Sequence, residues 1–103
     1  MPAVHMDQKN FDRLVIEEKR TALLDFWSPR CGPCRMLGPV IEAISEEVPA
    51  DVLVAKVDAD QEPGLAQRFG IMAIPTVIAF RDGQEVRRTV GLTSKEALLD
   101  LLK

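Results

Sequence analysis

The sequence predicts an α/β fold built on a mixed β-sheet that is covered on both faces. Three apolar runs of strand length, at residues 21–27, 52–57 and 76–80, are separated by segments with helical periodicity. After the third run, Asp82-Gly83 marks a tight hairpin, and the chain ends in a further helical pattern. Strands that alternate with helices favour parallel neighbours, whereas a hairpin adds an antiparallel strand, so we expect a mixed sheet.

The N-terminal part is expected to form a short strand, a short helix and the first buried strand. Residues 3–6 suit the short strand. Phe11, Leu14 and Val15 are spaced i, i+3, i+4, which predicts a brief amphipathic helix. Residues 21–27, TALLDFW, then read as an apolar strand that one acidic residue interrupts.

The strongest helical signal covers residues 31–47, where apolar side chains recur every three or four positions. Pro39 lies inside this helix, removes one backbone donor and should kink it. Residues 52–57, VLVAKV, are expected to form the second buried strand. Pro63 suits the first turn of the next helix, and Gly70 suits a left-handed exit from it.

The C-terminal part is expected to contain an antiparallel pair of strands and a helix. Residues 76–80 and 85–90 flank the hairpin turn. Thr93 and Glu96 have the spacing of a capping box, so Thr93 should cap the last helix. The apolar face of that helix consists of Ala97, Leu98, Leu101 and Leu102.

The composition is that of one globular domain over residues 1–103. Hydrophobic residues make up 47% of the chain and charged residues 28%, a balance typical of soluble proteins. The length suits a single core, and no repeat, low-complexity tract or linker marks a boundary. We expect a monomer.

Charge and hydropathy argue against nucleic-acid and membrane binding. Sixteen acidic and thirteen basic residues give a net charge of −3, without a basic stripe. No apolar run reaches the roughly 18–20 residues that span a bilayer, and the first residues lack the pattern of a secretory signal. We therefore expect a cytoplasmic protein. A reducing compartment does not maintain structural disulfides, so the two cysteines of the chain are expected to have a chemical rather than a structural role.

Both cysteines lie in the segment Cys31-Gly32-Pro33-Cys34, between a strand and the long helix. A thiolate is the species that attacks disulfides, and a helix N-terminus favours it through free N–H groups and the helix dipole. Pro33 gives up an N–H that the first turn does not need. The spacing assigns Cys31 as nucleophile and Cys34, one turn further on, as the resolving thiol.

Three other interpretations of the cysteine pair compete with a redox role. A structural zinc site needs four ligands, and the chain offers two cysteines and the single, distant His5, so we expect no metal. Two buried cysteines without chemistry would not explain the Gly-Pro between them and the flanking arginines. A cysteine protease needs a histidine base, for which His5 on an edge strand is a weak candidate.

Asp25 and Lys56 each interrupt an apolar strand. Either side chain could point to solvent from a half-exposed strand. The alternative is a partly buried Asp25 carboxylate with a raised pKa, close to the cysteines and modulated by Lys56. Such a carboxylate could accept the proton of Cys34 when a mixed disulfide is resolved. The sequence leaves both alternatives open.

With these residues in place, the chain resembles the thioredoxin family over its whole length. The matching stretches are LLDFW, CGPCR, AKVDAD, FGIMAIPT and VGL, in family order and spacing. The resemblance implies the thioredoxin fold, a central mixed β-sheet flanked by four α-helices. It also implies reduction of disulfides in protein substrates and a part in cell redox homeostasis, with Cys31 attacking and Cys34 resolving.

Further roles come from the resemblance alone. Asp25 matches the buried carboxylate of the family and Lys56 the lysine near it, while Pro75 matches a cis-proline that faces the active site. The substrate-binding positions implied by the match are Trp27, Gly32, Pro33, Ile74, Pro75 and Gly91. The electron donor of the family is an NADPH-dependent flavoprotein, thioredoxin reductase, so the cofactor belongs to the partner and none is expected here.

Arg30 departs from the family, which usually has tryptophan immediately before the first cysteine. A guanidinium beside Cys31 should favour the thiolate and make the pair more oxidising, unless the side chain extends into solvent and is screened. Arg30 is therefore a modulating residue. A protein poised as isomerase or oxidant is the first alternative function, and a binding module whose thiols are incidental is the second.

Overall fold

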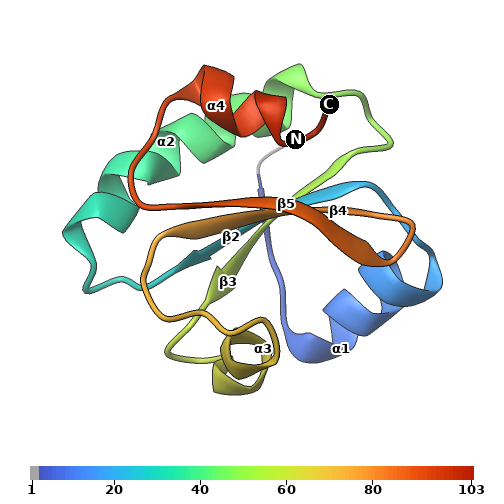
Figure 1. Cartoon of the computed structure of the whole chain (residues 1–103), viewed down its shortest axis with the longest axis horizontal. Coiled ribbons are helices and arrows are strands. Elements are labelled where there is room, and N and C mark those ends of the chain that lie inside the picture. The colour runs from blue at the N-terminus through green and yellow to red at the C-terminus, as the bar shows by residue number, and fades with distance from the viewer. Residues whose placement is uncertain (1–2) are drawn as a thin grey trace.

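The computed structural model describes residues 3–103, which form a five-stranded mixed sheet between two layers of helices (Figure 1). The strands are β1 (Val4–His5), β2 (Ala22–Trp27), β3 (Leu53–Asp58), β4 (Thr76–Arg81) and β5 (Gln84–Val90). Their order is β1-β3-β2-β4-β5, so β2 lies at the centre. β1 and β2 pair parallel to β3, whereas β4 pairs antiparallel to β2 and β5. The expected mixed sheet is confirmed.

The helices cover both faces of the sheet, with α2 and α4 on one side and α1 and α3 on the other (Figure 1). They are α1 (Gln8–Phe11), α2 (Gly32–Glu47), α3 (Pro63–Arg68) and α4 (Lys95–Asp100), and a π-helical segment, η1 (Asp12–Glu17), continues α1. The prediction of four helices is confirmed.

Side chains of β2 alternate between two apolar cores, as successive residues of a strand must. Leu24 and Phe26 enter the core on the side of α1 and α3, together with Phe11, Val15 and Leu65. Leu23 enters the core beneath α2 and α4, whose members include Leu37, Ile41, Ile44 and Leu98. Asp25 is two residues from Leu23 and therefore lies on the α2 face of the sheet.

The first helix is longer than the pattern around Phe11 predicted. The carboxylate of Asp7 caps it by accepting a hydrogen bond of 2.8 Å from the backbone N–H of Asn10. Its C-terminal part adopts π-helical geometry, in which the N–H of Glu18 reaches the carbonyl of Arg13 at 3.0 Å. Phe11 and Val15 are its buried residues, so the predicted apolar face is confirmed.

The cap predicted for the last helix is wrong by one residue. The hydroxyl of Ser94, not that of Thr93, accepts a hydrogen bond of 3.1 Å from the N–H of Ala97. Serine and threonine are both good caps, and the capping-box spacing from Thr93 to Glu96 favoured the wrong one of two adjacent hydroxyls.

The other residues predicted to form turns and helix ends agree with expectation. Gly70 takes the left-handed conformation with φ of 61° at the exit from α3. Asp82 and Gly83 have φ of 55° and 80°, which matches a tight hairpin. α2 continues through Pro39 without interruption, and a kink there stays a prediction.

Candidate active site

Cys31 and Cys34 form a disulfide at the N-terminus of α2, with their Cα atoms 5.2 Å apart. Cys31 is the N-cap residue, and its Sγ accepts a hydrogen bond of 3.2 Å from the backbone N–H of Cys34. Pro33 occupies the first turn, where a missing N–H costs nothing. Cys31 is partly exposed, whereas Cys34 is only 2% exposed. Only Cys31 is open to an incoming disulfide, which is what the predicted division of roles requires.

A second loop closes against Cys31. The peptide bond between Ile74 and Pro75 is cis, as the resemblance implied. The carbonyl oxygen of Ile74 lies 3.7 Å from Sγ of Cys31. The N–H of Gly91 donates to the carbonyl of Pro75 at 2.8 Å, and Gly91 adopts φ of 95°. Three segments far apart in sequence therefore meet at the disulfide.

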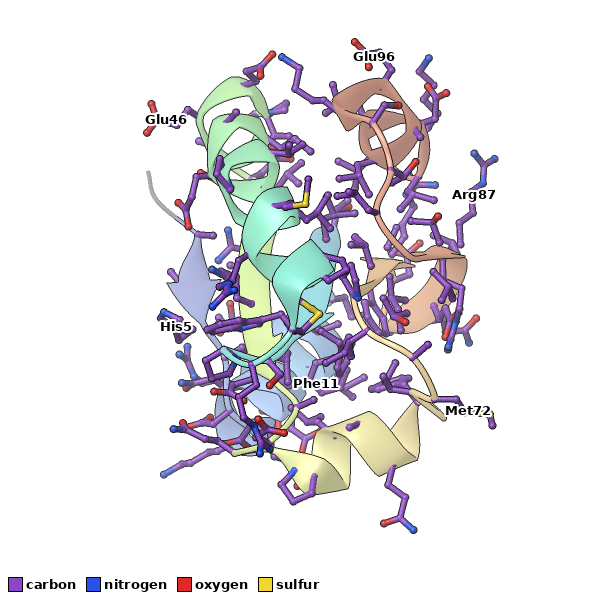
Figure 2. All side chains as sticks on the ribbon, turned by 90° about the vertical axis from the view of Figure 1, so that its left-hand side faces the viewer. His5, Phe11, Glu46, Met72, Arg87 and Glu96 are labelled. Atoms are coloured by element: carbon purple, nitrogen blue, oxygen red, sulfur yellow. A yellow bond between two sulfur atoms is a disulfide. The ribbon has the colours of Figure 1, made fainter. Side chains whose placement is uncertain are left out.

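Exposed apolar side chains neighbour these segments along the chain. They are Met36, Met72, Val90 and Leu92, and Met72 is 97% exposed and points away from the body of the protein (Figure 2). An open cleft of about 470 Å³ runs from Ile74 along α3. Isolated exposed apolar residues are ordinary, but several beside one loop cluster indicate a contact surface. None of the four was predicted as a site residue. Met72 and Leu92 lie outside helices and strands, where apolar side chains carry no periodic signal, and Met36 and Val90 belong to α2 and β5.

Asp25 is buried in the central strand, with 1% of its surface exposed. It faces Lys56 across the β2–β3 pairing and Val77 across the β2–β4 pairing. Neither carboxylate oxygen has a hydrogen-bond partner among the described residues. Burial raises the pKa of Asp25 from 3.8 to about 7, and the charge of Lys56 acts in the opposite direction. The solvent-facing alternative is excluded.

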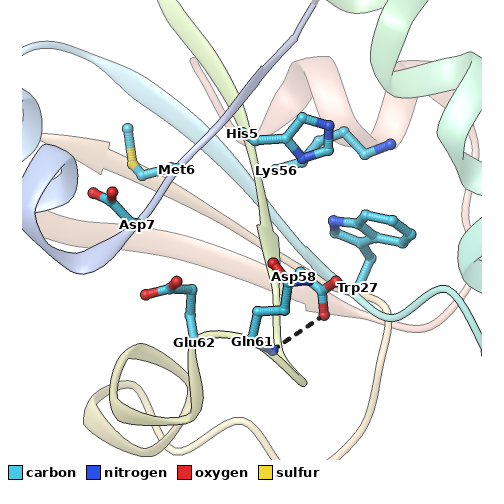
Figure 3. Close-up of a pocket in the computed structure, with 8 residues that line it drawn as sticks. All are labelled: His5, Met6, Asp7, Trp27, Lys56, Asp58, Gln61 and Glu62. Carbon is cyan, nitrogen blue, oxygen red and sulfur yellow. Dashed lines mark hydrogen bonds between the residues drawn. The ribbon is translucent and has the colours of Figure 1, made fainter.

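Lys56 is half-buried and contacts Trp27, so two predicted site residues lie together. The Lys56 ammonium lies over the indole ring, 4.5 Å from its centroid. The ring of His5 lies 6.2 Å from the same indole. All three side chains line a pocket of about 430 Å³ at the ends of β1, β2 and β3 (Figure 3). Through this pocket Lys56, which lies opposite Asp25 on β3, is open to solvent.

Arg30, in the loop between β2 and α2, forms an ion pair with Asp60. Its guanidinium lies 3.3 Å from Oδ2 of Asp60, in the segment between β3 and α3. The same oxygen accepts a hydrogen bond of 2.6 Å from the hydroxyl of Ser28, which is 4% exposed. The hydrogen bond from Ser28, helped by the charge of Arg30, holds the pKa of Asp60 below its usual value. Neither Ser28 nor Asp60 was predicted from the sequence as a member of the site.

The structure identifies neither a membrane span nor a metal cluster over residues 3–103. Within that range, no helix has the length and apolarity to cross a bilayer. Nor does that range bring three or more histidine, cysteine or carboxylate side chains together in a metal-binding arrangement.

Comparisons with known proteins agree with the geometry. The model of the thioredoxin family matches residues 2–103. A thioredoxin of Mycobacterium tuberculosis is 43% identical over 96 residues, covering 93% of this chain and 83% of its own length. Thioredoxin 1 of Synechococcus elongatus is 40% identical over 100 residues, covering 97% and 94%.

A solved structure shows the same fold. It is an asparagine-to-glutamine mutant thioredoxin from Halobacterium salinarum NRC-1, with a TM-score of 0.88 and 36% identity, covering 98% of this chain and 88% of that one. Proteins of this family act on disulfides through a cysteine pair at the position of Cys31 and Cys34. The chain therefore belongs to the thioredoxin family, has the thioredoxin fold and is a thiol–disulfide oxidoreductase.

Proposed function

We propose that this protein is a cytoplasmic, monomeric, single-domain reductant of protein disulfides. An NADPH-dependent flavoprotein, thioredoxin reductase, returns two electrons to the Cys31–Cys34 pair after each cycle. The observation that carries the proposal is the asymmetry of the pair, since Cys31 is partly exposed at a helix N-terminus and Cys34 is buried one turn behind it.

In the first step, the Cys31 thiolate attacks one sulfur of the substrate disulfide. A mixed disulfide forms, and the second substrate sulfur leaves as a thiolate. The backbone N–H of Cys34, which points at Sγ of Cys31 in the oxidised form, stabilises negative charge on that atom in the reduced form. The dipole of α2 acts in the same direction.

In the second step, Cys34 attacks Sγ of Cys31 and releases, as a thiolate, the substrate sulfur to which Cys31 had become bonded. Cys34 must lose its proton to do so, and Asp25 accepts it. Asp25 lies on the face of the sheet that α2 covers, and its pKa of about 7 lets it take and return a proton near neutral pH. Lys56, its neighbour on β3, limits how far burial raises that pKa.

The substrate chain docks beside the disulfide, on the surface formed by the cis-proline loop and its neighbours. Gly32 leaves the approach to Cys31 open, since among the described residues no atom beyond its chain neighbours and its own turn of helix lies within 4 Å of where a Cβ would stand. Ile74 and Pro75 provide apolar contact, and Gly91 supports their loop through its hydrogen bond to Pro75. Trp27 also contributes to docking of the substrate chain, from the end of β2, where its ring contacts Lys56.

Arg30 modulates the redox poise. A cation beside Cys31 favours its thiolate and hence the reduced form, which would make the protein an oxidant or isomerase. The carboxylate of Asp60 lies 3.3 Å from the guanidinium and offsets part of that charge, which weakens its effect on Cys31 and favours the reductant function.

The test is the thiol–disulfide equilibrium of the cysteine pair in glutathione buffers of known ratio. A reductant stays largely disulfide-bonded except at strongly reducing ratios, and it reduces a protein disulfide in a manner that Cys31→Ser abolishes. Ready reduction of the pair by glutathione would contradict the proposal and favour the oxidant or isomerase. Unchanged function in the double variant Cys31→Ser, Cys34→Ser would instead indicate a binding module.

A further inference from the structure

The residue before the nucleophile carries an exposed cation that is already held in place. The Arg30 side chain is 84% exposed, yet its guanidinium is anchored to Asp60 at 3.3 Å. A guanidinium has five N–H donors, and one contact through a single nitrogen leaves most of them directed to solvent. These free donors lie one residue from the atom that any substrate disulfide must approach.

Asp60, which holds the Arg30 guanidinium, is itself held in place by hydrogen bonds. The buried hydroxyl of Ser28 donates to Oδ2 of Asp60 at 2.6 Å, and the backbone N–H of Arg30 donates to the oxygen of Ser28 at 3.3 Å. Asp60 is further held by a hydrogen bond of 2.9 Å from its N–H to a carboxylate oxygen of Asp58. The guanidinium therefore starts from a restricted set of positions, which lowers the entropy lost when it binds a second anion.

We propose that Arg30 is a specificity-determining residue that selects protein disulfides flanked by an acidic residue. A substrate carboxylate next to the attacked half-cystine binds the free edge of the guanidinium while the apolar part of the chain lies against Ile74 and Pro75. Planar guanidinium groups bind carboxylates through paired, charge-assisted hydrogen bonds, whereas a neutral flank lacks the charge and a basic flank is repelled. The inference rests on the proposed reductant function and names its substrate class.

The chemical step does not change. The dithiol of Cys31 and Cys34 is oxidised to a disulfide, the substrate disulfide is reduced to two thiols, and two electrons pass from protein to substrate. Arg30 acts before this exchange, on encounter and docking, so its effect belongs to the second-order rate constant at low substrate concentration. Asp60 repels the incoming carboxylate, which limits the preference to that of an exposed ion pair.

The experiment uses fully reduced protein in single turnover and two synthetic peptides with one disulfide each. The peptides are identical except that Asp flanks both half-cystines in one and Asn in the other. The quantity measured is the ratio of the second-order rate constants for the Asp and Asn peptides. This ratio removes any effect of Arg30 on the intrinsic reactivity of Cys31, because such an effect acts on both peptides alike.

In Arg30→Gln, we expect the ratio to fall about two- to fivefold below that of the unchanged protein, the range of an exposed ion pair. Arg35→Gln is the matched control, since Arg35 is also exposed and lies in the first turn of α2, and it should retain the ratio. Raising the salt concentration to about 0.5 M should bring the unchanged protein close to Arg30→Gln.

Two results would overturn the inference and keep the reductant function. One is a ratio that Arg30→Gln leaves unchanged, and the other is an equal fall in Arg35→Gln, which would indicate the general field of the helix end. If the unchanged protein reduces neither peptide, the proposed function fails and the inference fails with it.

Discussion

The buried carboxylate of Asp25 should make the stability of the protein depend strongly on pH. Burial raises its pKa from 3.8 to about 7, so between these values the folded protein holds a proton that the unfolded chain has lost. The free energy of unfolding therefore falls as pH rises from about 4, and the loss is complete above pH 7. A shift of about 3 units at roughly 1.4 kcal/mol per unit corresponds to a loss of about 4 kcal/mol.

Asp25→Asn isolates this contribution. Asparagine has a similar shape and does not titrate, so its free energy of unfolding should lack this fall with pH. The difference in unfolding free energy, variant minus unchanged protein, should then grow by about 4 kcal/mol between pH 4 and pH 9. A buried amide without partners carries its own cost of roughly 1–3 kcal/mol, but that cost does not depend on pH.

The assay is guanidinium chloride unfolding of the disulfide form at several pH values, because the oxidised cysteines do not titrate. Other carboxylates titrate equally in both proteins and cancel in the difference. Lys56→Met provides a second variant. Removing the cation should raise the pKa of Asp25 further, so the stability loss should still begin near pH 4 but extend to higher pH and become larger. Parallel stability curves for the unchanged protein and Asp25→Asn would refute the reasoning.

Two further predictions concern the loops around the disulfide. Gly91→Ala should lower the free energy of unfolding by roughly 1–2 kcal/mol, because φ of 95° strains any residue with a Cβ. Gly38→Ala, inside α2 with open space around it, should raise it by up to about 1 kcal/mol, and like changes in the two variants would contradict this. Ser28→Ala should raise the pKa of Asp60 by removing its strongest hydrogen bond, as NMR titration of the carboxyl would show. An unmoved pKa would mean that this bond is absent in solution.

Much of the fold could be predicted from the sequence because its local signals agree with one another. The three apolar runs became β2, β3 and β4, and the best periodic segment became α2. The cysteine pair was predictable for the same reason, since a cysteine directly before a Gly-Pro helix start can only lie at the N-terminus of that helix.

The state of Asp25 could not be predicted from the residues alone. A single acid in an apolar strand fits a solvent-facing position as well as a buried one, and the sequence does not say which face α2 will cover. Only the assembled sheet decides, because β2 is its central strand and helices cover both faces. The residues left both alternatives open, and the resemblance to thioredoxins favoured the buried one.

The ion-pair partner of Arg30 could not be predicted from local sequence patterns either. Ser28 and Asp60 are 32 positions apart, and the ion pair spans a similar distance along the chain. Such contacts depend on how the loop after β2 and the loop after β3 meet at the same edge of the sheet. Parallel pairing of β2 and β3 brings their ends together, with Trp27 opposite Asp58, and so places the two loops side by side.

The free energy of unfolding that is lost by burying Asp25 is informative about its role in the resolving step. A domain of this size is stable by roughly 5–15 kcal/mol, so a group that removes about 4 kcal/mol above neutral pH is a large burden. An apolar residue at this position in β2 would avoid that cost and complete the core beneath α2. The carboxylate has no hydrogen-bond partner among residues 3–103 and contributes nothing to stability in exchange, but it has the pKa that a proton acceptor for Cys34 requires. The combination of high cost and suitable pKa is what we expect of a residue retained for the resolving step, and it is why Asp25→Asn should gain stability and lose speed at alkaline pH together.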